Sequence, residues 1–305
     1  AYQIRQLIAK KHVSPVEIVD MFLNRISSLD YKLNSYITVA YDEALKDAKN
    51  AERAVLRGTE IGPLHGVPIS VKDLELTKGI RTTSGSLVFK DRVPDVDSIV
   101  VQRIKESGAI IIGKTNTPEF GTGSQTFNEI FGATRNPYDS TKTCGGSSGG
   151  AAVALASGML PIADGSDLGG SLRNPASFCN VVGFRPSTGR VPIWPRPAAW
   201  FPFDVQGPLA RTVGDVALLL SAMAGSDPHD PLSLNEPGRR FREPLDRDFK
   251  GTRVAWTPDL GGLPIDPCVT DVLKSPQVYF CLLFVWYKEL HHPRHKIIMA
   301  VTLPI

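Results

Sequence analysis

Hydrophobic residues recur at helical spacing near the start of the chain. The stretch "SPVEIVDMFLNRI" opens with Ser14 as the expected N-cap, Pro15 at the first helical position and Glu17 closing a capping box. Its apolar residues fall at i, i+3, i+4 and i+7 and predict one amphipathic helical face: Val19, Phe22, Leu23 and Ile26.

Short apolar strands alternate with further predicted helices. In "GVPISVKD" the apolar positions alternate with others, which predicts a short strand that ends at Lys72. Helices are expected over about 42–57 and 98–107, the second leads into the buried strand "AIIIG", and another helix starts at Thr212. This alternation predicts an α/β fold with a layered sheet.

Composition narrows the classes of partner. The 305 residues are 42% hydrophobic and 21% charged, which is typical of globular proteins, and the net charge of +3 argues against nucleic acid and anionic membranes. The longest apolar run, 278–287, is half of what a helix needs to cross a bilayer. We therefore expect no nucleic acid and no membrane partner.

The cysteines and the start of the chain favour a reducing compartment. No two of the cysteines form a CxxC pair, so neither a disulfide framework nor a zinc site is expected. The chain begins at Ala1 inside an apparent helix, without the pattern of a signal peptide. A cytoplasmic location follows as an expectation. The four cysteines are Cys144, Cys179, Cys268 and Cys281.

A glycine–serine loop, "GGSSGG" at 145–150, has several interpretations. A phosphate-binding Walker loop needs a lysine after its glycines, and none follows here. The loop also matches G-x-S-x-G, the nucleophile elbow of α/β-hydrolases, with Ser147 as nucleophile. That elbow should follow a buried strand, whereas "NPYDSTKTC" precedes it, and it needs a downstream histidine. The candidates are His229, His291, His292 and His295.

A second glycine–serine turn follows 24 residues after Ser147, at 169–171. A helix-length segment and the short strand "LPIA" separate the two turns, so one helix and one return strand can bring them together. Backbone N–H groups from Leu168 to Ser171 could hold an oxyanion there. The alternative is a plain glycine-rich turn with an N-cap serine.

A nucleophilic serine needs a base, and Lys72 is a candidate. It ends an apolar strand, and burial lowers the pKa of a lysine from about 10.4 because a low dielectric disfavours the charged form. The alternative is a surface lysine paired with Asp73.

Together these segments resemble the amidase signature family of serine hydrolases. The resemblance rests on "GVPISVKD", "GGSSGG" and "GSDLGGSLRNPASFCNVVGFRPSTGRV" at 165–191. It implies a mixed central β-sheet flanked by helices on both faces. It also implies hydrolysis of a small-molecule carboxylic amide to a carboxylate and ammonia or an amine through a seryl acyl-enzyme, with no metal or organic cofactor.

The resemblance also implies residue roles. Ser171 would be the nucleophile, Lys72 the base, and Ser147 a relay serine that follows a cis peptide bond. The oxyanion would be held by the backbone N–H groups of Leu168, Gly169, Gly170 and Ser171. Three further residues would fix these loops by hydrogen bonds: Ser148, Asp167 and Arg173.

The resemblance weakens toward the end of the sequence. We expect an incomplete amidase signature domain over 1–275, with its core motif at 140–191, and an atypical tail over 276–305. Family members are longer, so the C-terminal part of the sheet is expected to be missing. The tail holds His291, His292 and His295, but no acidic or thiolate partners complete a metal site. A catalytically inactive fragment of the fold stays an alternative.

The substrate is left open between two branches. One branch contains glutamine-hydrolysing A-type subunits of tRNA-dependent amidotransferases, which feed ammonia to a partner. The other contains free-standing amidases, and an apolar acyl pocket would suit this branch. A homodimer of this chain is a further possible assembly. The aromatic residues of the segment 192–213 either form that pocket or pack in the core: Trp194, Trp200, Phe201 and Phe203.

Overall fold

The chain forms two compact units, which are described separately. The computed structural model describes residues 1–246, 248, 253–256, 259, 262–274 and 286–289. The first unit is Ala1–Glu243 and the second is Pro244–Leu303. In the second, β9 (Arg253–Trp256) and β10 (Trp286–Glu289) pair in parallel, and residues 267–274 are helical. The expected boundary at 275/276 and the tail histidines His291, His292 and His295 lie outside the described residues.

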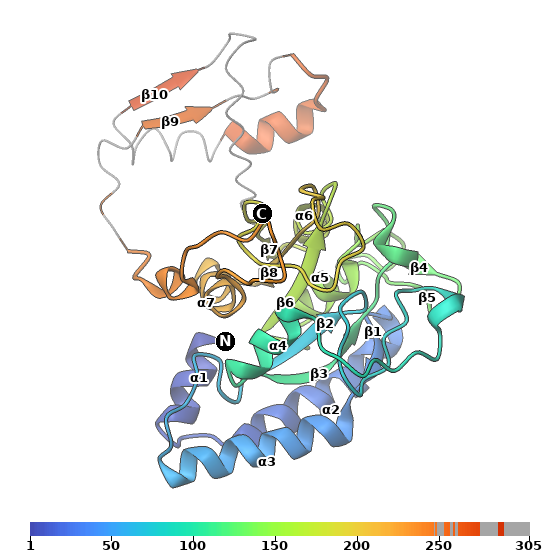
Figure 1. Ribbon diagram of the computed structural model, residues 1–305. Coiled ribbons are helices and arrows are strands. Elements are labelled where there is room, and N and C mark those ends of the chain that lie inside the picture. Colours follow the sequence, from blue (N-terminus) through green and yellow to red (C-terminus); the bar gives the residue numbers. More distant parts are fainter. Residues whose placement is uncertain (247, 249–252, 257–258, 260–261, 275–285, 290–305) are drawn as a thin grey trace. The chain divides into compact units, whose positions relative to one another are not determined.

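A six-stranded mixed sheet forms the centre of the first unit (Figure 1). The strand order is β1-β3-β2-β6-β8-β7, in which β2 runs parallel to β3 and β6 while the other pairings are antiparallel. The predicted mixed sheet is confirmed. Its strands are β1 (Tyr36–Val39), β2 (Pro68–Lys72), β3 (Ile110–Thr115), β6 (Ile162–Asp167), β7 (Val182–Gly183) and β8 (Val205–Ala210).

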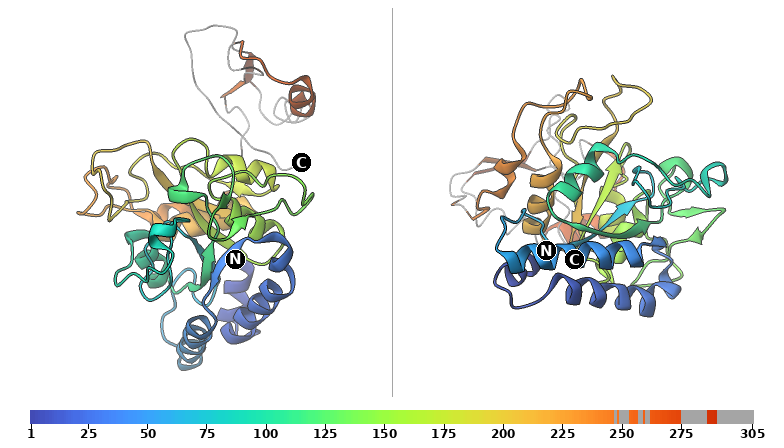
Figure 2. Two further views of the ribbon diagram at one scale, coloured as in Figure 1. Left: turned by 90° about the vertical axis from the view of Figure 1, so that its right-hand side faces the viewer. Right: turned by 60° about the horizontal axis from the view of Figure 1, so that its bottom comes forward.

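Helices cover both faces of this sheet. One apolar core joins one sheet face to α2, α3 and α5, and a second joins the opposite face to α4 and α7. Figure 2 shows α2 and α3 side by side. The α-helices are α1 (Tyr2–Ala9), α2 (Pro15–Leu33), α3 (Tyr41–Arg57), α4 (Ile99–Glu106), α5 (Gly149–Ala156), α6 (Arg173–Phe178) and α7 (Val213–Met223). The shorter elements are η1 (Leu87–Phe89), η2 (Glu119–Gly121), β4 (Phe127–Asn128), β5 (Gly132–Ala133) and η3 (Gly238–Arg242).

The predicted helix boundaries follow from local capping. Helix α2 begins with the complete capping box of Ser14 and Glu17. Helix α3 ends at Gly58, whose φ of 71° is the left-handed conformation that favours glycine. Helix α7 begins at Thr212, whose side chain accepts a hydrogen bond from the Asp215 N–H. Within the described part of the chain, none of the helices is long and apolar enough to cross a membrane.

Strand β2 is more deeply buried than its alternating sequence suggests. All five of its residues are buried, because helices cover the sheet on both sides. Lys72 at its end is therefore fully buried, and the alternative of a surface lysine is wrong. The fold brings an amine into the protein interior, where it needs polar partners.

Candidate active site

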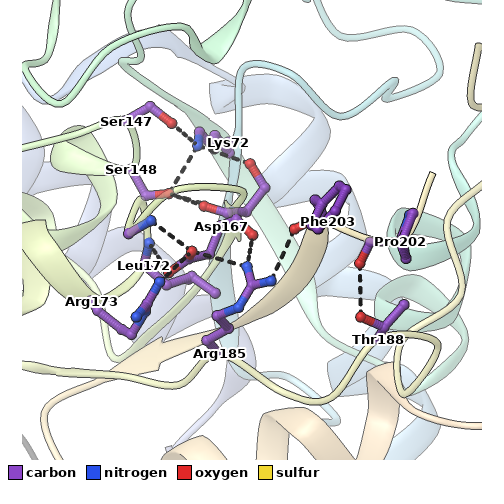
Figure 3. A network of polar contacts seen from close by, with 12 residues as sticks. Lys72, Ser147, Ser148, Asp167, Leu172, Arg173, Arg185, Thr188, Pro202 and Phe203 are labelled. Carbon is purple, nitrogen blue, oxygen red and sulfur yellow. Dashed lines mark hydrogen bonds and ion pairs between the residues drawn. The ribbon is translucent and has the colours of Figure 1, made fainter. Parts of the chain in front are cut away.

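The Lys72 ammonium group reaches three serine hydroxyls. Its Nζ donates hydrogen bonds to Ser147 Oγ at 2.7 Å, Ser148 Oγ at 2.9 Å and Ser166 Oγ at 3.0 Å. Figure 3 shows Ser147 and Ser148 pointing toward the lysine from the loop before α5. Because a hydroxyl can both donate and accept a hydrogen bond, these partners suit either the charged or the neutral amine.

Burial lowers the pKa of Lys72. Desolvation lowers its pKa to about 8, although the negative charges of Asp164, Asp204, Glu75 and Asp167 oppose this effect. An amine with a pKa near 8 is partly neutral around neutral pH and above, and only the neutral form can accept a proton.

The loop that carries Ser147 approaches another backbone closely. The Gly146–Ser147 peptide bond is cis, as the resemblance implies. A Cβ atom at Gly146 would lie 2.9 Å from the backbone nitrogen of Gln125, so no side chain fits there. The close approach therefore requires glycine immediately before Ser147.

The second glycine–serine turn lies next to the first, as the expected helix and return strand require. It follows β6, and the backbone N–H of Ser148 donates to the carbonyl oxygen of Ser171 at 3.2 Å. Ser171 is half-buried, whereas Leu168 and Gly169 are exposed. A Cβ atom at Gly169 would meet no other atom within 4 Å, so open space lies in front of this part of the turn.

Asp167 holds this turn in shape. Its carboxylate accepts hydrogen bonds from the N–H groups of Gly170 at 2.8 Å and Leu172 at 3.1 Å, and from Arg173 Nε and Nη2, both at 3.0 Å. Arg185 Nη1 adds a bond to Oδ1 at 3.0 Å. Burial alone would raise the pKa of Asp167, but the bonds from Arg173 and the backbone lower it to about 2.

One of the four expected oxyanion donors is already engaged. The Gly170 N–H points at the Asp167 carboxylate rather than toward the front of the turn. Gly170 has a φ of 120°, a conformation that glycine adopts readily and other residues do not. We therefore remove Gly170 from the expected oxyanion donors and retain Leu168, Gly169 and Ser171 as candidates.

Two polar contacts in this region were not anticipated from sequence patterns. Ser166 accepts a hydrogen bond from Lys72. Its position immediately before Asp167, at the end of β6, is the feature of the sequence that could have indicated this contact. Arg185 contacts both Asp167 and the carbonyl oxygen of Phe203, the latter at 2.9 Å (Figure 3). No local pattern marks Arg185, because only the tertiary fold brings these segments together.

The nucleophile-elbow alternative lacks its partners in the described residues. Turns and bends, rather than a buried strand, lead into Ser147. His65 bonds to the carbonyl oxygen of Ala51, and the exposed His229 bonds to Asp227, while Ser147 contacts Lys72. These contacts favour a lysine as the partner of Ser147.

The aromatic residues of the segment 192–213 lie at the surface. Trp194, Trp200, Phe201 and Phe203 are 38%, 74%, 39% and 62% exposed, so packing in the core does not explain them. Phe201 and Phe203 form an edge-to-face pair with ring centroids 5.5 Å apart. Through its carbonyl oxygen, Phe203 is tied to Arg185 and so to Asp167 of the second turn.

The first unit is thus an α/β protein whose buried Lys72 contacts serines on a glycine-rich loop and on the strand before a second glycine-rich turn. The protein-family model described as Amidase matches residues 17–275, and the chain belongs to this family.

Relatives of known structure or name support this assignment. The chain is 40% identical over 274 residues to the A-type subunit of glutamyl-tRNA(Gln) amidotransferase from Moorella thermoacetica, covering 90% of this chain and 56% of that protein. A bacterial aryl acylamidase of the amidase signature family matches with a TM-score of 0.89 and 35% identity, covering 94% of this chain and 60% of that one. Native peptide amidase from Stenotrophomonas maltophilia matches with a TM-score of 0.82 and 30% identity, covering 94% and 60%. The chain thus spans somewhat more than half the length of these relatives.

The environment of Asp167 leads to a prediction about stability. Because its pKa is lowered in the folded state, its ionised form stabilises the fold above about pH 4, and this contribution is lost as the pH falls toward 2. Asp167→Asn should lower the free energy of unfolding by about 2 kcal/mol at pH 7, with a smaller difference at pH 3. Denaturant unfolding at the two pH values measures both differences.

A surface carboxylate provides the control for this measurement. Asp91→Asn, at a side chain that is 80% exposed, should change the free energy of unfolding by less than about 0.5 kcal/mol at either pH. An equal loss in the Asp167 variant at pH 7 and pH 3 would contradict the assigned role of the ionised carboxylate.

Proposed function

We propose that this protein hydrolyses a carboxylic amide through an acyl-enzyme on Ser171, with Ser147 as relay and Lys72 as base. The observation that carries the proposal is the 2.7 Å hydrogen bond between the buried Lys72 Nζ and Ser147 Oγ. A base with a pKa near 8 suits proton transfer around neutral pH.

The first chemical step forms a tetrahedral intermediate on Ser171, and the acyl-enzyme follows when the C–N bond breaks. Neutral Lys72 accepts the hydroxyl proton of Ser147, which in turn takes the proton of Ser171 as its Oγ bonds to the amide carbonyl carbon. The carbonyl oxygen gains the negative charge, and the N–H groups of Leu168, Gly169 and Ser171 are the proposed donors to it.

The relay then runs in reverse to release the amine. Lys72, now protonated, returns a proton through Ser147 to the amide nitrogen, and the C–N bond breaks. Water attacks the acyl-enzyme with the same groups as base, which gives the carboxylate and restores Ser171. The cycle uses side chains and backbone N–H groups of this chain, the amide and water.

The surface aromatic residues support an amide with an apolar or aromatic group. Phe201 and Phe203 are exposed, and the Arg185 bridge links Phe203 to the turn that carries Ser171. Stacking or edge contacts on such rings favour aromatic partners. The structural similarity to an aryl acylamidase agrees with this choice of substrate.

A second candidate function is glutamine hydrolysis. The 40% identity to the A-type subunit of a glutamyl-tRNA(Gln) amidotransferase favours it. In that case the amide would be small and polar, ammonia would be passed to a partner protein, and the exposed aromatic residues would play no part in substrate binding.

Labelling with a fluorophosphonate tests the catalytic residues. Peptide mapping should place the label on Ser171, and Ser171→Ala should abolish it. Lys72→Ala should lower the labelling rate by about 10²–10⁴, because the serine loses its base. In the unmodified protein the rate should rise as the pH increases through about 8, as Lys72 loses its proton.

Two outcomes would contradict this assignment. Label on Ser147 that persists in Lys72→Ala would favour the nucleophile elbow. Folded protein that takes up no label would indicate a fragment that kept the fold without the activity. Circular dichroism of each variant separates loss of reactivity from loss of folding.

A comparison of two amides tests the substrate class. We expect kcat/KM for an aryl acyl amide to exceed that for glutamine by at least about tenfold, since fully burying a phenyl-sized group contributes about 1.5–3 kcal/mol and tenfold corresponds to about 1.4 kcal/mol. Phe203→Ala should lower the aryl value, while Tyr31→Ala, at a ring that is 75% exposed on α2, serves as the control. Preference for glutamine with no effect of Phe203→Ala would support the second candidate instead.

A further inference from the structure

A buried carboxyl group lies on the strand next to the proposed base. Asp164, on β6, is fully buried, and its Oδ1 accepts a hydrogen bond from the backbone N–H of Lys72 at 2.7 Å. Strands β2 and β6 run in parallel here, so this bond ties the end of β2 to the strand that leads into the nucleophile turn. The proposed mechanism gives Asp164 no role.

The other oxygen of Asp164 is poorly satisfied. Oδ2 has no hydrogen-bond partner among the described residues. An ionised carboxylate with an unpaired buried oxygen is costly, so this site favours the protonated acid. Burial first, and the nearby Glu75 second, raise the pKa of Asp164 accordingly.

Other charged groups share this interior. Lys114, on β3, donates to Thr77 Oγ1 at 2.7 Å and to the carbonyl oxygen of Glu75, and its positive charge also acts on Asp164. The Glu75 side chain accepts bonds from Ser98 and Gln206. The carboxyl groups whose charges act on Lys72 are Asp164, Asp204, Glu75 and Asp167.

Among the described residues, Asp164 is the one of these four carboxyl groups with a hydrogen bond to Lys72. It bonds directly to the main chain of Lys72, and it comes first among the charges that favour the protonated lysine. Glu75 and Asp167 instead have both oxygens engaged by other donors. Of these four carboxyl groups, Asp164 is therefore the one whose charge acts most directly on the protonation of Lys72.

We propose that Asp164 is a positioning residue for the general base, which anchors the main chain at Lys72 and controls through its own charge how readily Lys72 releases a proton. When Asp164 is protonated, it no longer stabilises the ammonium form of Lys72, so the lysine loses its proton more readily and can act as a base. When Asp164 ionises, its negative charge stabilises the ammonium form. This inference rests on the proposed function, because it assigns Asp164 a role through Lys72.

Two substitutions separate the charge from the anchor. Asp164→Asn removes the charge but keeps an oxygen that can accept the Lys72 N–H, whereas Asp164→Ala removes both. The measurement is the rate of fluorophosphonate labelling of Ser171 between about pH 5.5 and about pH 9.5, on either side of the lysine midpoint. Burial raises the pKa of Asp164 to about 7, so the group still carries negative charge where Lys72 titrates, near pH 8. Both variants remove that charge and should move the midpoint of the rise to lower pH, by about one unit. The Ala variant should also have a lower maximal labelling rate, because it loses the hydrogen bond that anchors the Lys72 main chain.

A control variant and the wild-type profile make the outcomes distinct. Asp30→Asn removes a carboxylate that likewise accepts backbone N–H groups, those of Ser35 and Tyr36, and should leave the midpoint in place. If the midpoint of the labelling profile is unchanged or higher in Asp164→Asn, this inference is overturned and the proposed function is not. If Asp164→Asn does not fold, the same result in Asp164→Ala decides the question. Absence of label on wild-type Ser171 overturns the proposed function and this inference with it.

Discussion

The arrangement of this protein depends on keeping one amine, the Nζ of Lys72, out of water. Strand β2 carries the lysine between two helical layers, and three serine hydroxyls replace the lost solvent. Desolvation lowers the pKa of the amine to about 8, while nearby carboxylates limit the shift. The elements that supply those hydroxyls, the loop before α5 and the end of β6, are thereby held against the end of β2.

The second constraint is the shape of the turn after β6. Asp167 binds the backbone on both sides of Ser171 and is itself held by Arg173 and Arg185. A carboxylate with so many donors stays ionised, so the turn keeps its shape across the pH range in which Lys72 titrates. The same arginine reaches Phe203, which links the proposed nucleophile turn to the surface aromatic residues.

Local sequence patterns predicted those parts of the fold that short-range rules specify. The capping box at Ser14, the helix expected over about 42–57 and the strand that ends at Lys72 all follow from such rules and are confirmed. The candidate residues came from motif resemblance, and the structure brings Lys72 and Ser147 into contact. Contacts of Arg185 and Asp164 could not be predicted, because strand pairing and loop crossing bring together residues with no shared local pattern.

The most direct test of the central claim is the titration of Lys72 itself. Nuclear magnetic resonance of protein labelled at the lysine Cε carbons, with Lys72→Met to assign the signal, follows its protonation. A midpoint near pH 8, well below the value of about 10.4 for ordinary lysines, is the result that a buried base predicts. Titration of Lys72 together with the surface lysines would contradict it.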